Sequence, residues 1–449
     1  MRFVTSLTLA TAASAFVITK GRLSVFKDKI RHDAASLLTD VQDAVDSSIH
    51  DAVDSVSSGA NSVRDAKKRI EEELSGKFNG VHDDRDQDLD IDSISNARYD
   101  LTNLTIYQIL EKSNHTKKFF KAVNKYDDIV KLLNDTEEGH GYTLFVPTDA
   151  AFDDIPEDHK KPSDEFIKNA IKYHIGLGWY PAGRILTTHT IPTAYKEEFL
   201  GDQPQRLRTS VSLSGVSVNV YSKVIAADFE AKNGVIHAVN HILVPPTLIG
   251  REISFFPAEF STLLLAYEKT DFVKYVHGLH FVGSTVFAPS NRAWEKLGPA
   301  ANAYLFNTEE GKKHLTALLK YQIVPNTTVY SDEIYYGNEK DGRVSVGDLM
   351  TNGHFHIQLP TLLKKDLSVD IYSFKLWTSI VVNGAVKVGF LDGIGKNGVI
   401  QVVEDIPVPH GKAGDGQKGW ENIEVEELKR RLDQFIESDD AESEEPGEL

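Results

Sequence analysis

The chain of 449 residues contains no cysteine, so neither a disulfide framework nor thiol chemistry is open to it. Its domains must therefore be held together by buried apolar surface, which domains of about 150 residues can supply. The length corresponds to about three units of that size. Hydrophobic residues make up 41% of the chain and charged residues 26%, a composition typical of globular domains.

Basic residues are also scarce relative to acidic ones. Lys and Arg number 49 against 66 Asp and Glu, which gives a formal net charge of -17. Because nucleic-acid binding draws its affinity from Lys and Arg that release counterions, we expect no nucleic-acid partner. The same excess disfavours electrostatic attraction to anionic lipid.

Long apolar runs are missing except at the start. Arg2, the apolar stretch Val4–Ala13 and the small residues Ala13–Ala15 predict a secretory signal peptide over residues 1–15. An uncleaved anchor is the alternative, but the run is short for a bilayer span of about 20 residues. We therefore expect a secreted mature chain with no transmembrane helix. Its acidic end, Glu437–Glu448, lacks the apolar tail of a GPI signal, so no GPI anchor is expected.

Signatures of catalytic chemistry are absent from the sequence as well. His237 and His241 fall in a stretch with strand character, where residues four apart stand about 13 Å apart, so they are expected to be core or sheet-edge histidines. Gly389–Gly398 lacks the spacing of a phosphate loop and predicts a hairpin turn. Neither a G-x-S-x-G nor an H-E-x-x-H motif occurs. We predict no catalytic residue, no metal site and no cofactor, and hence not an enzyme.

What the sequence does contain is a repeat. TLFVPTDAAF at Thr143–Phe152 returns as STVFAPSNRAW at Ser284–Trp294. Each copy predicts a buried strand that ends at a proline, which cannot continue a ladder. Side chains able to cap a following helix come next in both copies; they are Thr148 and Asp149, then Ser290 and Asn291.

Two further motifs repeat in the same order. FIKNAIKYHIG at Phe166–Gly176 matches HLTALLKYQIVP at His314–Pro325. NGVIHAVNHILVPP at Asn233–Pro246 matches NGVIQVVEDIPVPH at Asn397–His410. In the last pair an Asn-Gly turn runs into an alternating apolar strand.

With these three motifs the chain resembles the fasciclin (FAS1) family. The resemblance implies two tandem FAS1 domains, residues 99–249 and 250–410, with an α+β fold in which helices pack on a twisted β-sandwich. It implies a secreted, non-enzymatic adhesion protein that contacts extracellular matrix, cell wall or other cell-surface molecules. The alternative is a small-ligand-binding or enzymatic protein that uses a cleft between the repeats, which would require several titratable groups gathered in a buried cleft.

The resemblance also singles out Tyr173 and His174 as adhesion-motif candidates, since the Tyr-His motif of animal fasciclin proteins is implicated in integrin binding. The other reading is structural: an aromatic ring and a partly buried histidine at a helix end, closing a hydrogen bond that holds the domain together. In the second repeat Gln322 follows Tyr321, so integrin-type recognition is not expected there.

Four Asn-x-Thr sequons are candidates for N-glycosylation if the chain enters the secretory route: Asn103, Asn114, Asn134 and Asn326. We expect at least two of them to be glycosylated. The expected location is extracellular or cell wall, with the vacuolar lumen as the alternative. The expected partner is an extracellular or cell-wall protein or glycan, or a second copy of the chain, and tandem domains suit such a role because they raise avidity.

The segments around the repeats are more variable in character. Residues 16–80 carry apolar residues at a mean step of about 3.6 and predict an amphipathic helical segment, which would face the first repeat, a membrane surface or a partner chain. Residues 81–98 predict an acidic linker. Residues 411–449 predict a short helix and an acidic disordered tail. Within the first repeat, Leu104–Asn114 and Phe119–Leu133 predict two amphipathic helices.

Overall fold

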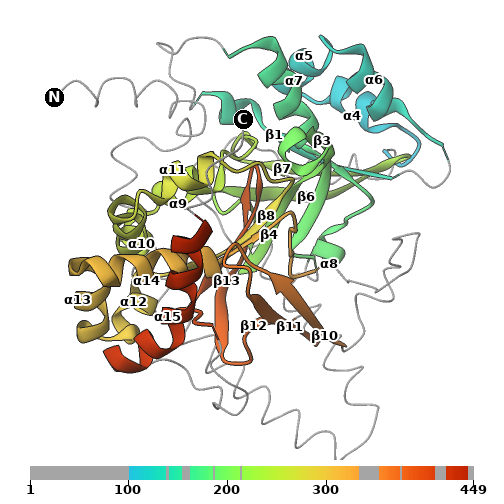
Figure 1. Cartoon of the computed structure of the whole chain (residues 1–449). Coiled ribbons are helices and arrows are strands. Elements are labelled where there is room, and N and C mark those ends of the chain that lie inside the picture. The colour runs from blue at the N-terminus through green and yellow to red at the C-terminus, as the bar shows by residue number, and fades with distance from the viewer. Residues whose placement is uncertain are drawn as a thin grey trace, which may run out of the picture.

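A computed structural model of the chain describes residues 101–137, 141–153, 162–185, 188–212, 215–332, 353–374, 377–409 and 421–442. The predicted signal peptide, amphipathic segment and acidic linker lie outside these residues. The described chain forms two α+β domains in tandem (Figure 1). Domain 1 comprises the elements from α4 to β7, and domain 2 those from α9 to α15.

Three short helices open domain 1: α4 (Ile106–Lys112), α5 (Lys117–Val123) and α6 (Asp127–Asn134). The single helix predicted over Phe119–Leu133 is therefore wrong, because the chain breaks it between α5 and α6. Asp127 and Asp128 occupy the first turn of α6, where acidic side chains favour the start of a new helix. The break lets the apolar faces of both helices reach the core.

The strands of domain 1 close into a barrel, in the order β1 to β7, with β1 and β7 running parallel. They are β1 (Tyr142–Pro147), β2 (Ile175–Leu177), β3 (Thr190–Glu197), β4 (Gln203–Ser212), β5 (Gly215–Val218), β6 (Ser222–Ala231) and β7 (Gly234–Val239). Between them lie η4 (Asp149–Phe152), α7 (Asp164–Tyr173), α8 (Ala182–Ile185) and η5 (Glu198–Leu200).

The helix expected after the first strand is only a 3₁₀ turn in domain 1, and Thr148 makes no capping bond to it. Asp149 instead accepts the backbone N–H of Lys118 at 2.7 Å, at the start of α5. In domain 2 the expectation holds, since the Ser290 hydroxyl accepts the N–H of Ala293 and opens a regular helix.

Domain 2 repeats the plan with a larger helical layer (Figure 1). Its helices are α9 (Ile249–Ser254), α10 (Pro257–Lys269), α11 (Phe272–His277), α12 (Asn291–Leu297), α13 (Pro299–Asn307), α14 (Glu309–Tyr321) and α15 (Val425–Glu442). Its strands are β8 (Ser284–Pro289), β9 (Ile323–Pro325), β10 (Gly353–Pro360), β11 (Asp366–Phe374), β12 (Trp377–Val382), β13 (Val386–Gly395) and β14 (Gly398–Val403). They form one sheet in the order β10-β11-β12-β13-β14-β8-β9.

The last helix, α15, corrects the prediction for the chain's end. It runs to Glu442 and so includes the first part of the tail predicted to be disordered from Glu437. Leu428 and Leu432 are fully buried and anchor the helix on the core of domain 2. Once a helix is anchored, each added residue gains a backbone bond at little cost, so it continues into the acidic sequence.

Candidate functional site

Tyr173, the first adhesion-motif candidate, is fully buried at the end of α7. Its hydroxyl donates to the backbone carbonyl of Arg206 at 2.9 Å and accepts from the Asn219 amide at 2.9 Å. Burial raises the pKa of this phenol well above its usual value, so it remains a neutral donor. The side chain thus ties α7 to β4 and to the turn after β5.

His174, the second candidate, caps the same helix and is 1% exposed. Its Nδ1 lies 2.7 Å from the carbonyl of Ala170, and its Nε2 accepts the backbone N–H of Leu243 at 2.9 Å. The ring therefore carries its proton on Nδ1. Burial lowers the pKa of His174 to about 4, so the ring is neutral near pH 7. It links α7 to the segment that follows β7.

Domain 2 repeats the tyrosine half of this arrangement. Tyr321 donates to the carbonyl of Asp366 at 3.2 Å and accepts from the Asn383 amide at 2.9 Å. Asn219 and Asn383 both adopt left-handed backbone conformations, with φ of 50° and 51°. Sequence reasoning missed both asparagines. The available signal was that asparagine tolerates the left-handed backbone conformation of such turns. Gln322 takes the histidine's place and is 1% exposed.

The two histidines four residues apart do not meet. His237 is fully buried in β7, where Nε2 lies 2.9 Å from the carbonyl of Tyr180 and Nδ1 accepts the N–H of Asp228 at 3.3 Å. His241 lies beyond the end of β7, with Nδ1 2.7 Å from the side-chain oxygen of Asn240. Both rings therefore form hydrogen bonds within domain 1.

Titratable groups gather instead where the two domains meet. Asp332 of domain 2 accepts the backbone N–H groups of His189 at 3.0 Å and Thr190 at 2.7 Å, and the Thr190 hydroxyl at 2.8 Å. The guanidinium of Arg206 lies 4.0 Å from the same carboxylate. One acidic side chain of domain 2 therefore satisfies three donors of domain 1, and hydrogen bonds to a charged acceptor are the stronger kind.

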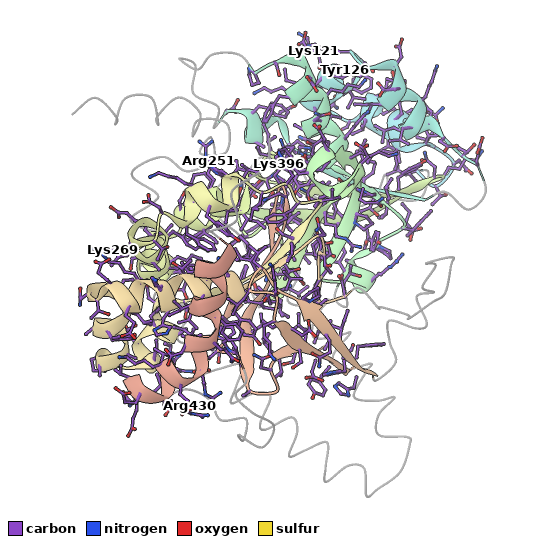
Figure 2. The ribbon with its side chains drawn as sticks, viewed as in Figure 1. Lys121, Tyr126, Arg251, Lys269, Lys396 and Arg430 are labelled. Atoms are coloured by element: carbon purple, nitrogen blue, oxygen red, sulfur yellow. The ribbon has the colours of Figure 1, made fainter. Side chains whose placement is uncertain are left out.

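Two arginines of β4 extend this contact, which we call the junction. Arg206 stacks 4.6 Å from the ring centroid of Tyr330. Arg208 stacks 4.1 Å from that of Phe390 and donates to the carbonyl of Leu391 at 2.8 Å. In the contacts of these two arginines, domain 1 contributes the cations and domain 2 the carboxylate and the rings, whereas Lys396 and Phe199 have the opposite arrangement. At the rim, Lys396 lies between the domains (Figure 2), 4.7 Å above the ring of Phe199.

The junction also brings together a serine, a histidine and an aspartate. His189 Nδ1 lies 2.7 Å from the Ser331 hydroxyl, which is hydrogen-bonded to Asp392. With the serine proton directed to Asp392, the His189 ring is the donor in its contact with the serine oxygen. In a catalytic triad the histidine stands between the acid and the serine and removes the serine proton. The order here is different, so the arrangement does not activate Ser331 as a nucleophile.

Asp392 is the most deeply buried acid of this group. Its carboxylate accepts the backbone N–H of Ser331 and the Gln401 amide, both at 2.9 Å. Burial, and then the charge of Asp332, raise the pKa of Asp392 above its usual value. No sequence motif indicates these acids, although Arg206 and Arg208 alternate with the buried Leu207 and so indicate one charged face of β4.

The four sequons differ in exposure. Asn103, Asn114 and Asn326 are exposed. Asn134 is partly buried at the end of α6, where its oxygen accepts the Thr105 hydroxyl at 2.7 Å and its nitrogen donates to the carbonyl of Val130 at 3.2 Å.

Two features are absent from the part of the chain that the structure describes. None of its helices combines the length and apolar character needed to cross a bilayer. No three His, Asp or Glu side chains in it are arranged to hold a metal ion.

The family model described as the fasciclin domain matches residues 114–245 and again residues 258–409. Aurofusarin biosynthesis cluster protein S of Gibberella zeae is 28% identical over 71% of this chain and 81% of its own length. Stabilin-2 of Rattus norvegicus is 25% identical over 51% of this chain but only 16% of its own length. Human periostin is 25% identical over 64% of this chain and 31% of its own.

Among solved structures, a FAS1 domain pair from the insect cell adhesion molecule fasciclin I is similar at 18% identity and a TM-score of 0.31. The match covers 65% of this chain and 95% of that one.

Proposed function

Because this chain belongs to the fasciclin domain family, as its motifs predict, we propose that it is a secreted, non-enzymatic binding protein. It contacts extracellular matrix, cell wall or other cell-surface molecules through its two domains. The partner is a protein or glycan of that environment. The predicted tandem α+β organisation is confirmed, and it is the premise of this proposal.

The proposal rests on the contacts between the two domains at the junction. Asp332, Arg206 and Arg208 join the domains through buried or half-buried polar contacts, so that two binding surfaces keep one orientation. Two weak contacts held in a fixed relation bind a repetitive or extended partner with greater avidity than either alone. A fixed geometry also avoids the entropy cost of ordering a flexible pair on binding.

The absence of an enzymatic role is supported by how the titratable groups are used. His174 and His237 are buried and hydrogen-bonded within domain 1. The acids of the junction accept hydrogen bonds from the protein itself. These groups act as structural hydrogen-bonding partners, and Ser331 lacks the base that a nucleophile requires.

We assign Tyr173 and His174 the structural role. Both side chains are inaccessible from outside, and each joins α7 to another part of domain 1. A partner would have to open the domain to touch them. The adhesive surface therefore lies among exposed residues of the pair.

The proposal is tested with the full chain on immobilised cell-wall glycans and matrix proteins. Binding is measured by biolayer interferometry for the wild type and for Asp332→Lys, which places a cation against Arg206. We expect the variant to keep both domains folded and to dissociate faster, because avidity is lost. Glu309→Lys, at an exposed site on α14, is the matched control. Equal dissociation rates for all three proteins, or a turnover activity abolished by Ser331→Ala, would contradict the proposal.

A further inference from the structure

A cavity of about 290 Å³ opens in domain 1 between α6, the second half of β3 and the start of β4. Its walls are mainly apolar and come from Ile129, Leu132, Leu177, Ala194 and Pro204. This volume lies near the lower limit for small-molecule sites, about 300 Å³. It suits a compact ligand of one or two fused rings.

Two lysines, Lys172 and Lys196, contribute to the lining together with Asp128. Asp128 already pairs with Lys172 and with Lys168, each at 3.1 Å. Lys196 is exposed, and no carboxylate in the described part of the chain pairs with it. The cavity therefore offers an apolar interior with an uncompensated cation beside it.

The second domain shows what fills the corresponding place. Asp128-Ile-Val-Lys-Leu132 has its counterpart in Asp271-Phe-Val-Lys-Tyr275, and Lys172 has its counterpart in Lys320. The ammonium group of Lys320 lies 5.0 Å from the ring centroid of Tyr275. That ring in turn packs 5.6 Å from the ring of Phe272. An aromatic ring under a lysine thus occupies this position in domain 2.

A second lining residue is also larger in domain 2. Thr193 donates to the carbonyl of Gln205 at 2.7 Å, and Thr361 donates to that of Lys365 at 2.7 Å, so the two threonines are equivalent. The residue that follows is Ala194 in domain 1 and Leu362 in domain 2. Domain 1 has a leucine where domain 2 has a tyrosine, and an alanine where domain 2 has a leucine. The smaller side chains leave space in domain 1 that the larger side chains fill in domain 2.

We propose that the domain 1 cavity binds a planar aromatic acid, with its ring against Leu132 and Ala194 and its carboxylate toward Lys196. The ring takes the place that Tyr275 fills in domain 2, within reach of the ammonium group of Lys172, where a cation and an aromatic face attract each other. The carboxylate pairs with the one lining cation that lacks a partner. This site goes beyond the adhesive function and does not depend on it.

The test titrates the full chain with 2-naphthoate and, separately, with uncharged 2-naphthol, by isothermal calorimetry. We expect one naphthoate bound per chain and weaker binding of the naphthol. Ala194→Leu and Leu132→Tyr, which install the domain 2 residues, should each lower naphthoate affinity about tenfold or more, or about 1.4 kcal/mol. Two independent filling variants are used so that a folding defect in one, detected by its thermal unfolding, leaves the other to decide.

Lys196→Gln tests whether the carboxylate of the ligand pairs with Lys196. It should weaken naphthoate binding and leave naphthol binding unchanged, while Lys269→Gln, an exposed lysine of α10 in the other domain (Figure 2), changes neither. Saturable 1:1 binding that the filling variants abolish supports the site. No binding at millimolar naphthoate, or binding that the folded filling variants leave intact, overturns it.

Discussion

The two domains share one framework and differ in what is placed on it. In both, a buried tyrosine ends a helix, donates to a strand carbonyl and accepts from an asparagine in a left-handed turn. The neighbouring position is His174 in domain 1 and Gln322 in domain 2. Both domains therefore use the tyrosine and the asparagine, whereas the position after the tyrosine is a histidine in one domain and a glutamine in the other.

The two domains also use one equivalent aspartate in different ways. Asp228 of β6 and Asp392 of β13 lie within equivalent bulges and have left-handed backbones, with φ of 62° and 60°. Asp228 accepts the N–H of Ala182 within its own domain, and Asp392 accepts from Ser331, which also contacts His189 of domain 1. The equivalent position thus takes part in the contact between the domains in domain 2 alone.

The largest expected effect tests the shared framework. Tyr173→Ala and Tyr321→Ala should each destabilise their own domain by about 4 kcal/mol, because each leaves a large cavity and removes two hydrogen bonds. Hydrogen exchange read by mass spectrometry follows the domains separately. A much smaller loss in one domain would break the equivalence of the two tyrosines.

The next prediction concerns the stability of domain 1 as a function of pH. The folded pKa of His174, about 4, lies below its ordinary value of 6.5, so the unfolded chain binds the proton first. Above pH 6.5 the neutral ring contributes its full stabilisation to domain 1. The free energy of unfolding of domain 1 should then fall by roughly 3 kcal/mol as the pH approaches 4. His174→Gln, which copies domain 2, should remove most of this acid dependence.

The control for that experiment lies in the same domain. His237, whose pKa burial also lowers, remains in the variant and retains a residual acid dependence of the same sign. Urea unfolding of domain 1 across this pH range is the measurement. Identical pH profiles for the wild type and His174→Gln would contradict the role given to His174.

A smaller effect is expected at the junction. Asp332→Ala leaves the N–H groups of His189 and Thr190 without their acceptor, which should cost about 2 kcal/mol of coupling between the domains. Faster exchange of these two amides, with unchanged exchange in the β1 strand, is the expected pattern. Protection that stays at the wild-type level would mean that water or another group replaces the carboxylate.

The smallest effect on stability concerns the sequons. We expect glycans on Asn103, Asn114 and Asn326, and none on Asn134, whose amide atoms are engaged within α6 and with Thr105. Peptide mapping of the protein from a eukaryotic secretory host reads each site. A glycan on Asn134, or unmodified exposed sites, would refute this ranking.

Sequence reasoning reached the repeat and the α+β class because strong local signals carry them. Asn233-Gly234 and Asn397-Gly398 predict hairpins, and a proline is the last residue of each first strand. It missed the break between α5 and α6 and overstated the helix after Pro147, since both depend on which side chain reaches the core or a neighbouring helix end.

The junction was out of reach for a different reason. Asp332 and His189 are far apart in the chain, and nothing in their local sequence distinguishes them from solvated residues. Only the packing of one domain on the other gives them partners. The cavity could not be predicted either, because Leu132 and Ala194 leave space only relative to their larger counterparts in domain 2, Tyr275 and Leu362.

The central claim is that the two domains form one rigid pair, and the lack of native cysteine makes it directly measurable. Spin labels on Lys121→Cys in domain 1 and Lys269→Cys in domain 2 are the sole attachment points (Figure 2). Electron-electron double resonance should give a single narrow distance distribution, which Asp332→Lys broadens. A broad distribution in the otherwise unaltered chain would show that the domains move independently and would contradict the account.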